Sequence, residues 1–204
     1  MRDISRRLLL TALAVLSLAA CQKAGTSAAS GDDMTLGNPK AKVTVVEYAS
    51  VACPHCARFN NDVFPAFKAK YIDTGLVHYV AREALTGEPT VAAAGFLLAR
   101  CAGKDKYFAV TDAIYRAQDQ IFQSGDVHGV LLHIAQSAGL SEDQMNKCIT
   151  DENAIKALND RVEKYSKQDG VDSTPTFIVN GKKMTPGEVT LAQLDTAIQP
   201  ALKK

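Results

Sequence analysis

The clearest hydrophobic pattern in the chain is a change of period in its first third. Residues 43–50 (Val-Thr-Val-Val-Glu-Tyr-Ala-Ser) are mostly β-branched and apolar, which is typical of a strand buried on both faces. After a short turn, Phe59, Val63 and Phe67 follow one another four positions apart, which is a helical spacing. The pattern predicts a strand that passes through a turn into a helix ending near Asp73.

Further elements can be read downstream. Residues 76–81 (Leu-Val-His-Tyr-Val-Ala) alternate and predict a second strand, parallel to the first because a helix joins the two. From about 88 to 167 helical patterns follow one another without a strand signal, including a single helix over 105–121. An apolar strand at 177–179, a hairpin turn, a return strand and a last helix over 190–202 complete the chain. The pattern predicts an α/β domain with a helical insertion.

The N-terminus has the features of an export signal. Three arginines precede a nonpolar run at residues 8–20, which matches a signal-peptide core and is too short to span a membrane. Residues 18–21 (Leu-Ala-Ala-Cys) resemble a bacterial lipobox, in which Cys21 becomes the lipid-modified first residue. Ordinary secretion with cleavage after Ala29 is the alternative, and residues 5–9 weakly resemble a twin-arginine signal. We expect a lipoprotein signal peptide at 1–20.

The segment after the signal is small and polar. Residues 21–34 offer little to bury and predict a flexible tether, followed by a turn at 36–39 that leads into the first strand. After removal of the leader at 1–20, about 184 residues remain, which is enough for one substantial domain with an insertion. The net charge is +1 for the full chain and about −1 after loss of the three leader arginines and Asp3. With no basic patch, repeat or phosphate loop in the sequence, we expect no nucleic-acid partner.

Two cysteines lie where the strand passes into the helix. Cys53 is expected at the helix N-terminus, where unpaired N–H groups and the helix dipole favour a thiolate. Pro54 suits the first helical position, and His55 can add a hydrogen bond or a positive charge to the Cys53 thiolate. Cys56 lies one turn further on the same face, within reach of a disulfide. The alternative, half of a zinc site, needs two more ligands, and the sequence has no second closely spaced Cys or His pair.

The remaining cysteines also form a pair. The chain has five cysteines, and either cleavage removes Cys21 from the count. With one pair at 53 and 56, elimination leaves Cys101 with Cys148, and an exported protein lives where such bonds persist. This bond would close a loop of about 48 residues, worth roughly 4 kcal/mol. The alternative is that both are buried free thiols.

Two motifs resemble a known family. Residues 47–50 (Glu-Tyr-Ala-Ser) with 53–56 (Cys-Pro-His-Cys) resemble the active-site segment of the DsbA family of thiol:disulfide oxidoreductases. Residues 170–181 (Gly-Val-Asp-Ser-Thr-Pro-Thr-Phe-Ile-Val-Asn-Gly) resemble the segment in which that family places a cis-proline before a strand. The resemblance covers roughly 35–202. It implies a thioredoxin fold with a central mixed sheet, formed by residues 35–86 and 168–204, and an inserted α-helical domain at 87–167.

The resemblance also implies roles for individual residues. Similar proteins have a cis bond before the proline equivalent to Pro175, although trans is the default for such bonds. The backbone of Thr174 would then pair with an extended substrate beside the disulfide. Glu47 would lie beneath the active site and handle protons for Cys56, whereas the alternative is an edge-strand carboxylate in solvent. His78, His128 and His133 receive no role.

The implied activity is that of a periplasmic thiol:disulfide oxidoreductase. It would donate the Cys53–Cys56 disulfide to exported proteins through a mixed disulfide, with Pro54, His55 and Glu47 tuning the reaction. The disulfide itself serves as the redox centre, so no metal, flavin or nucleotide is expected. A DsbB-like membrane enzyme would reoxidise the protein, which we expect to be a monomer held at the membrane only through lipidated Cys21.

Three alternatives remain open. An isomerase or reductase on the same scaffold is compatible with Thr174 before the cis-proline. The protein could also serve a single client in a maturation pathway. A non-catalytic lipoprotein could bind a metal through Cys53, His55 and Cys56.

Overall fold

The computed structural model describes residues 29–203, and a mixed sheet lies at its centre. Strands β2 and β3 are parallel, and the other neighbouring strands are antiparallel. The mixed sheet predicted from the family resemblance is therefore confirmed. In the described part of the chain, the sheet has five strands in the order β1 (Met34–Gly37), β3 (Val77–Glu83), β2 (Val43–Ala49), β4 (Thr176–Val179) and β5 (Lys182–Lys183).

Strand β1 corrects two expectations about the N-terminal segment. The residues expected to form a turn at 36–39 begin with the end of an edge strand, which pairs with β3. The end of the expected 21–34 tether is also packed, because Asp33 and Met34 are only 7% and 4% exposed. The Asp33 carboxylate faces the buried guanidinium of Arg82, at 3.4 Å from Nη2. This ion pair compensates the charge that the segment buries. Cys21, the signal peptide at 1–20 and the rest of the tether lie outside the described residues.

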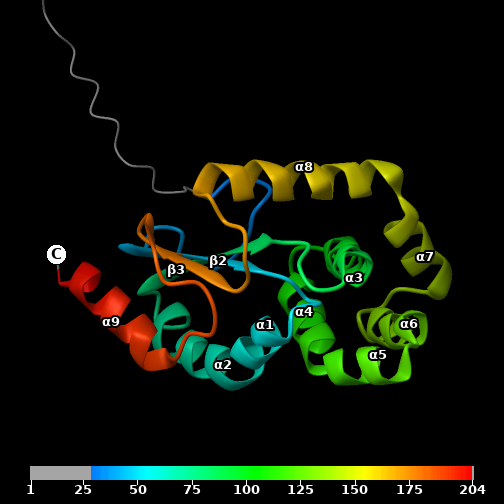
Figure 1. Cartoon of the computed structure of the whole chain (residues 1–204), viewed down its shortest axis with the longest axis horizontal. Coiled ribbons are helices and arrows are strands. Elements are labelled where there is room, and N and C mark those ends of the chain that lie inside the picture. Colours follow the sequence, from blue (N-terminus) through cyan, green and yellow to red (C-terminus); the bar gives the residue numbers. More distant parts are fainter. Residues whose placement is uncertain (1–28, 204) are drawn as a thin grey trace, which may run out of the picture.

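One face of the sheet is covered by the helix that follows the two cysteines. This redox helix comprises α1 (Pro54–Arg58), a π-helical turn (Phe59–Val63), α2 (Phe64–Phe67) and a second π-helical turn (Lys68–Ile72). It ends within one residue of the expected position. Together with α9 (Leu191–Leu202) it buries one hydrophobic core against β2, β3 and β4. Figure 1 shows α1, α2 and α9 on this side and α8 on the other.

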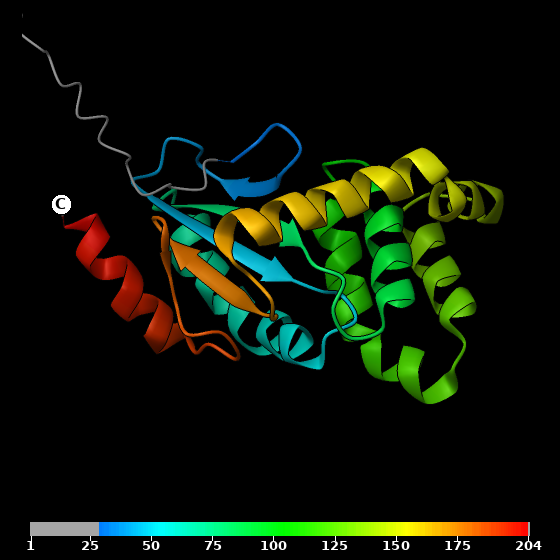
Figure 2. The ribbon, with the colours of Figure 1, turned by 45° about the horizontal axis from the view of Figure 1, so that its top comes forward.

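The predicted helical block joins β3 to β4. Its helices are α3 (Pro89–Cys101), α4 (Tyr107–Arg116), α5 (Gln118–Ser124), α6 (Val127–Ser137), α7 (Glu142–Thr150) and α8 (Glu152–Asp169). The single helix expected over 105–121 is wrong, because the backbone at Ala117 has ψ of 0° and divides it into α4 and α5. Residue 167, where the insertion was expected to end, lies inside helix α8. Helix α8 continues over the second face of the sheet (Figure 2). Its Tyr165 packs there with Tyr48 and Ile178.

A disulfide and a close packing contact organise the insertion. Cys101 at the end of α3 and Cys148 in α7 are joined, which is the pairing expected from the cysteine count. Gly95 of α3 packs tightly on the segment after β2, since a Cβ there would lie 2.7 Å from Val51 Cγ2. The core of the insertion accordingly includes Cys53 and Cys56. Among residues 29–203, no helix combines the length and the hydrophobicity needed to cross a bilayer.

Candidate active site

The two cysteines of the redox helix lie at the junction expected from the sequence. Cys53 has extended backbone angles and caps the helix, and Pro54 occupies its first turn. The Cys53 N–H donates to the Ser50 carbonyl at 3.0 Å, which closes the turn at residues 50–53, hereafter the redox turn. Both side chains are free thiols in this structure, and both are buried, at 6% exposure for Cys53 and 1% for Cys56.

The surroundings push the pKa values of the two thiols apart. The pKa of Cys53 is lowered to about 5, chiefly by a hydrogen bond from the Cys56 thiol. Contacts from Thr174 and from the backbone N–H groups of Cys56 and His55 lower this pKa further, whereas burial opposes the shift. Burial is the main reason why the pKa of Cys56 lies well above its ordinary value, followed by the hydrogen bond and charge of Cys53. At neutral pH Cys53 is therefore a thiolate and Cys56 a thiol.

The second motif lies directly against this pair. The Thr174–Pro175 peptide bond is cis, as the family resemblance implies. The Thr174 carbonyl oxygen is 3.5 Å from Cys53 Sγ, and the Thr174 hydroxyl shares a hydrogen bond with the hydroxyl of Thr86. Two segments far apart in the sequence thus meet at the reactive sulfur.

Glu47 lies on β2 inside the sheet, between Ala81 of β3 and Phe177 of β4, so it is not an edge-strand residue. It is 4% exposed and accepts a hydrogen bond from the Tyr79 hydroxyl. Burial raises the pKa of Glu47 to about 7, and the bond from Tyr79 opposes the rise. The charge of Glu47 in turn contributes to the raised pKa of Cys56. Its placement suits the expected proton-handling role, which stays a prediction.

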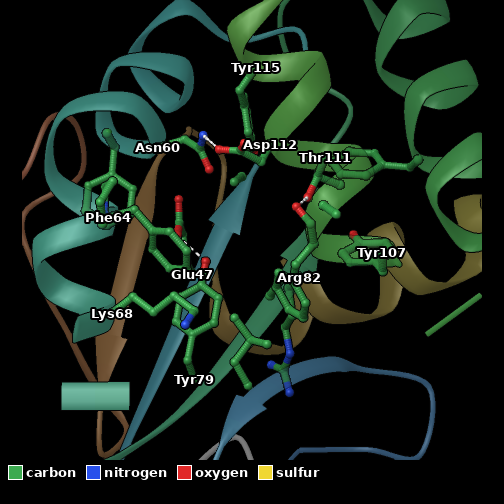
Figure 3. A pocket seen from close by; sticks show the side chains of 18 residues that line it. Glu47, Asn60, Phe64, Lys68, Tyr79, Arg82, Tyr107, Thr111, Asp112 and Tyr115 are labelled. Carbon is green, nitrogen blue, oxygen red and sulfur yellow. Dashed lines mark hydrogen bonds between the residues drawn. The ribbon is translucent and has the colours of Figure 1, made fainter. Parts of the chain in front are cut away.

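Glu47 also borders a cavity of about 340 Å³ between the sheet, the redox helix and α4 (Figure 3). Most of the lining is aromatic or aliphatic, and it includes Phe64 and Tyr115. Asn60 and Asp112, joined at 2.8 Å, place polar groups in the same lining. The cavity has room for several waters beside the carboxyl group.

The ring of His55 pairs with a carboxylate that precedes α9. Its Nδ1 is 2.5 Å from Glu188 Oε1, and the guanidinium of Arg58 contacts both residues. In this geometry an exposed carboxylate holds the ring, and His55 reaches the Cys53 sulfur through its backbone N–H. The expected action of the imidazole on the thiolate stays a prediction. Glu188 precedes α9, where no local signal in the sequence links it to the cysteines. The hydrogen bonds from His55 and Arg58 lower its pKa.

Other supports of the redox turn were also missed by sequence reasoning. The Ser50 hydroxyl donates to the Thr86 carbonyl at 2.7 Å. Gly87 has φ of +77°, and a Cβ there would lie 2.4 Å from the Ala52 carbonyl oxygen. From the insertion, the Gln118 amide donates to two carbonyls of the turn. Only Gly87 offers a sequence signal, because a glycine commonly marks a positive φ.

A metal centre does not assemble from these side chains. Within residues 29–203 no group of three or more His, Cys, Asp and Glu side chains is arranged to hold a metal ion. The donor set proposed for a metal-binding lipoprotein needs the His55 ring beside both thiols, whereas that ring pairs with Glu188.

Comparison with known proteins gives a consistent picture. Residues 29–200 match the family model described as Thioredoxin. The "Putative protein-disulfide oxidoreductase" of Rickettsia bellii is 34% identical over 176 residues, covering 85% of this chain and 67% of that protein. The corresponding Rickettsia conorii protein is 34% identical over 174 residues, covering 85% of this chain and 61% of that protein. The chain therefore spans 61–67% of the length of these relatives. The crystal structure of Wolbachia pipientis alpha-DsbA1 superposes with a TM-score of 0.77 at 27% identity, covering 86% of this chain and 93% of that one.

Proposed function

The chain belongs to the thioredoxin family, among its DsbA-like protein-disulfide oxidoreductases, and we propose that it oxidises exported proteins by donating its Cys53–Cys56 disulfide. The observation that carries the proposal is the asymmetry of the pair. Cys53 caps the redox helix, where its pKa is lowered to about 5, whereas Cys56 is buried within the helix, where its pKa is raised well above its ordinary value. A stabilised Cys53 thiolate favours the reduced form of the protein, which makes the oxidised form the stronger oxidant.

The reaction proceeds in two exchanges. A substrate thiolate attacks Cys53 Sγ, the Cys53–Cys56 bond breaks, and Cys56 leaves with the electron pair. A mixed disulfide now joins Cys53 to the substrate. A second substrate thiolate attacks the substrate sulfur of that bond and Cys53 leaves as a thiolate. The substrate gains one disulfide, and the protein gains the two electrons.

The two leaving groups differ in their need for a proton. Cys53 leaves as a stable thiolate, whereas Cys56, with its raised pKa, must take up a proton. Glu47 is the proposed donor, because burial raises its pKa to about 7 and it lies close enough for its charge to act on Cys56. Reoxidation reverses this transfer.

The same proposal covers substrate, partner and location. An extended substrate segment would pair with the backbone of Thr174 beside the cis-proline. The Thr174 carbonyl contacts Cys53 Sγ, so the segment would lie next to the reactive sulfur. A DsbB-like membrane enzyme would reoxidise the cysteines, and the disulfide would serve as the sole redox centre. The protein would work in the periplasm as a monomer, tethered through lipidated Cys21.

An isomerase or reductase is the second candidate, because Thr174 before the cis-proline is compatible with such enzymes. The two activities differ in the direction of net thiol exchange. Service to a single client remains a narrower form of the same chemistry.

The test is a stoichiometric oxidation assay. Oxidised protein is mixed with an equimolar reduced, unfolded substrate, and the thiols of both partners are counted. We expect substrate thiols to disappear as the thiols of Cys53 and Cys56 appear, with a transient mixed disulfide at Cys53. The Cys56→Ser variant cannot hold the disulfide and should be inactive, whereas a Cys101→Ser/Cys148→Ser variant should remain active. Persistent substrate thiols, with reduction or isomerisation of a scrambled substrate instead, would move the protein to the second candidate.

A further inference from the structure

The redox turn contains buried backbone carbonyls. Val51 and Cys53, which carry two of them, are 0% and 6% exposed. A buried carbonyl needs a hydrogen-bond donor, because an unpaired one costs a large part of its hydration free energy. The Cys53 carbonyl accepts one bond from the helix itself, from Ala57 N–H at 3.1 Å.

A side chain from the insertion supplies further donors. Gln118 Nε2 lies 2.8 Å from the Val51 oxygen and 3.2 Å from the Cys53 oxygen. Since both facing atoms are acceptors, only the NH₂ end of the amide can satisfy them. Gln118 is itself 5% exposed, so its bonds form where water competes little.

The break between α4 and α5 belongs to this arrangement. Gln118 is the first residue of α5, directly after Ala117, whose ψ of 0° ends α4. A continuous helix over 105–121 would place residue 118 at a fixed 100° around the helix axis from its predecessor. The break therefore sets the direction in which the amide points.

One of the two carbonyls belongs to Cys53, the residue that carries the reactive sulfur. Carbonyl oxygens carry partial negative charge, which disfavours a thiolate near them unless hydrogen-bond donors offset it. We propose that Gln118 is a positioning residue: by holding the Val51 and Cys53 carbonyls it fixes the redox turn and strengthens the protein as a thiol oxidant. The inference rests on the proposed function and assigns the helical insertion a direct part in tuning the redox centre.

The test replaces the amide and measures the cysteines. Gln118→Met keeps the length of the side chain and removes both donors, and Gln118→Asn keeps the amide but shortens its reach by one methylene. Gln120→Met is the matched control, because Gln120 is on the same helix and is exposed. For each protein the readouts are the thiolate absorbance of the reduced form against pH, the equilibrium constant with glutathione, and the unfolding midpoint of the oxidised form.

We expect the pKa of Cys53 to rise by about half a unit to one unit in Gln118→Met. The equilibrium should shift roughly two- to tenfold toward a weaker oxidant, about the net free energy of a hydrogen bond, because only part of the effect of the two lost bonds reaches the sulfur. Gln118→Asn should shift in the same direction, and Gln120→Met should match the wild type. A lower unfolding midpoint with unchanged pKa and equilibrium in both Gln118 variants would reduce Gln118 to a structural residue and overturn the inference. A reducing equilibrium in the wild type itself would instead overturn the proposed function.

Discussion

Replacing Glu47 by Gln should stabilise the oxidised protein, and by more as the pH rises. Glu47 sits inside the sheet with its carboxyl group bonded to the Tyr79 hydroxyl. Gln keeps the shape and the acceptor for Tyr79 but cannot ionise. The substitution therefore isolates the free-energy cost of a buried negative charge.

The magnitude follows from the pKa of Glu47, which burial raises from 4.5 to about 7. Each pKa unit corresponds to about 1.4 kcal/mol, so ionising Glu47 in the folded protein costs about 3 kcal/mol more than in the unfolded chain. Below pH 4.5 both states hold the proton and the cost is absent. Between 4.5 and about 7 the unfolded chain loses the proton first, so wild-type stability falls, and above about 7 the loss is complete.

Denaturant unfolding of both proteins at a series of pH values measures this difference. Using the oxidised form removes the titration of Cys53 and Cys56, and the contribution of other groups cancels between variant and wild type. The variant should gain about 3 kcal/mol over the wild type between pH 4.5 and 7.5. Glu163→Gln, at an exposed site in the interior of α8, should stay within about 0.5 kcal/mol of the wild type throughout. A Glu47→Gln difference that stays constant or shrinks as the pH rises would refute the reasoning.

Other consequences concern the framework around the site. Gly87→Ala should destabilise the protein by about 2 kcal/mol or more. The added Cβ would lie 2.4 Å from the Ala52 carbonyl oxygen, and the backbone φ of +77° is strained for alanine. An unchanged denaturation midpoint would contradict this. Replacing both Cys101 and Cys148 by Ser should cost about 4 kcal/mol in unfolding experiments, because the bond spans 47 positions, while oxidation of substrate continues through the other two cysteines. Asp33→Asn should lower stability by about 2 kcal/mol, because it weakens the buried, charged contact with Arg82. Thermal unfolding that matches the wild type would show that this contact does not anchor the N-terminal segment.

Local sequence patterns predicted much of the fold. The buried strand at 43–50, the proline at the start of the helix and the spacing of Phe59, Val63 and Phe67 together located the redox helix and both cysteines on it. Two helices, α7 and α9, begin with a capping box, in which a Ser or Thr is followed three residues later by a Gln. The cis bond before Pro175 came from the family resemblance, because no local rule favours it.

What the sequence missed depends on partners far along the chain. Asp33 looked like part of a polar tether because its partner, Arg82, lies 49 positions away. The His55 ring was expected to act on its neighbour Cys53, whereas Glu188, 133 positions away, holds it. The break that aims Gln118 falls in a run with helical periodicity and no Gly or Pro. Such features follow from tertiary packing, which overrides local preference.

The most direct test of the proposed function is the titration of the Cys53 thiolate in the reduced protein, read by its ultraviolet absorbance and paired with its equilibrium against glutathione. A midpoint near pH 5 together with an oxidising equilibrium is the predicted result. A midpoint near the ordinary thiol value with a reducing equilibrium would contradict it, and would identify the protein as a reductase or isomerase.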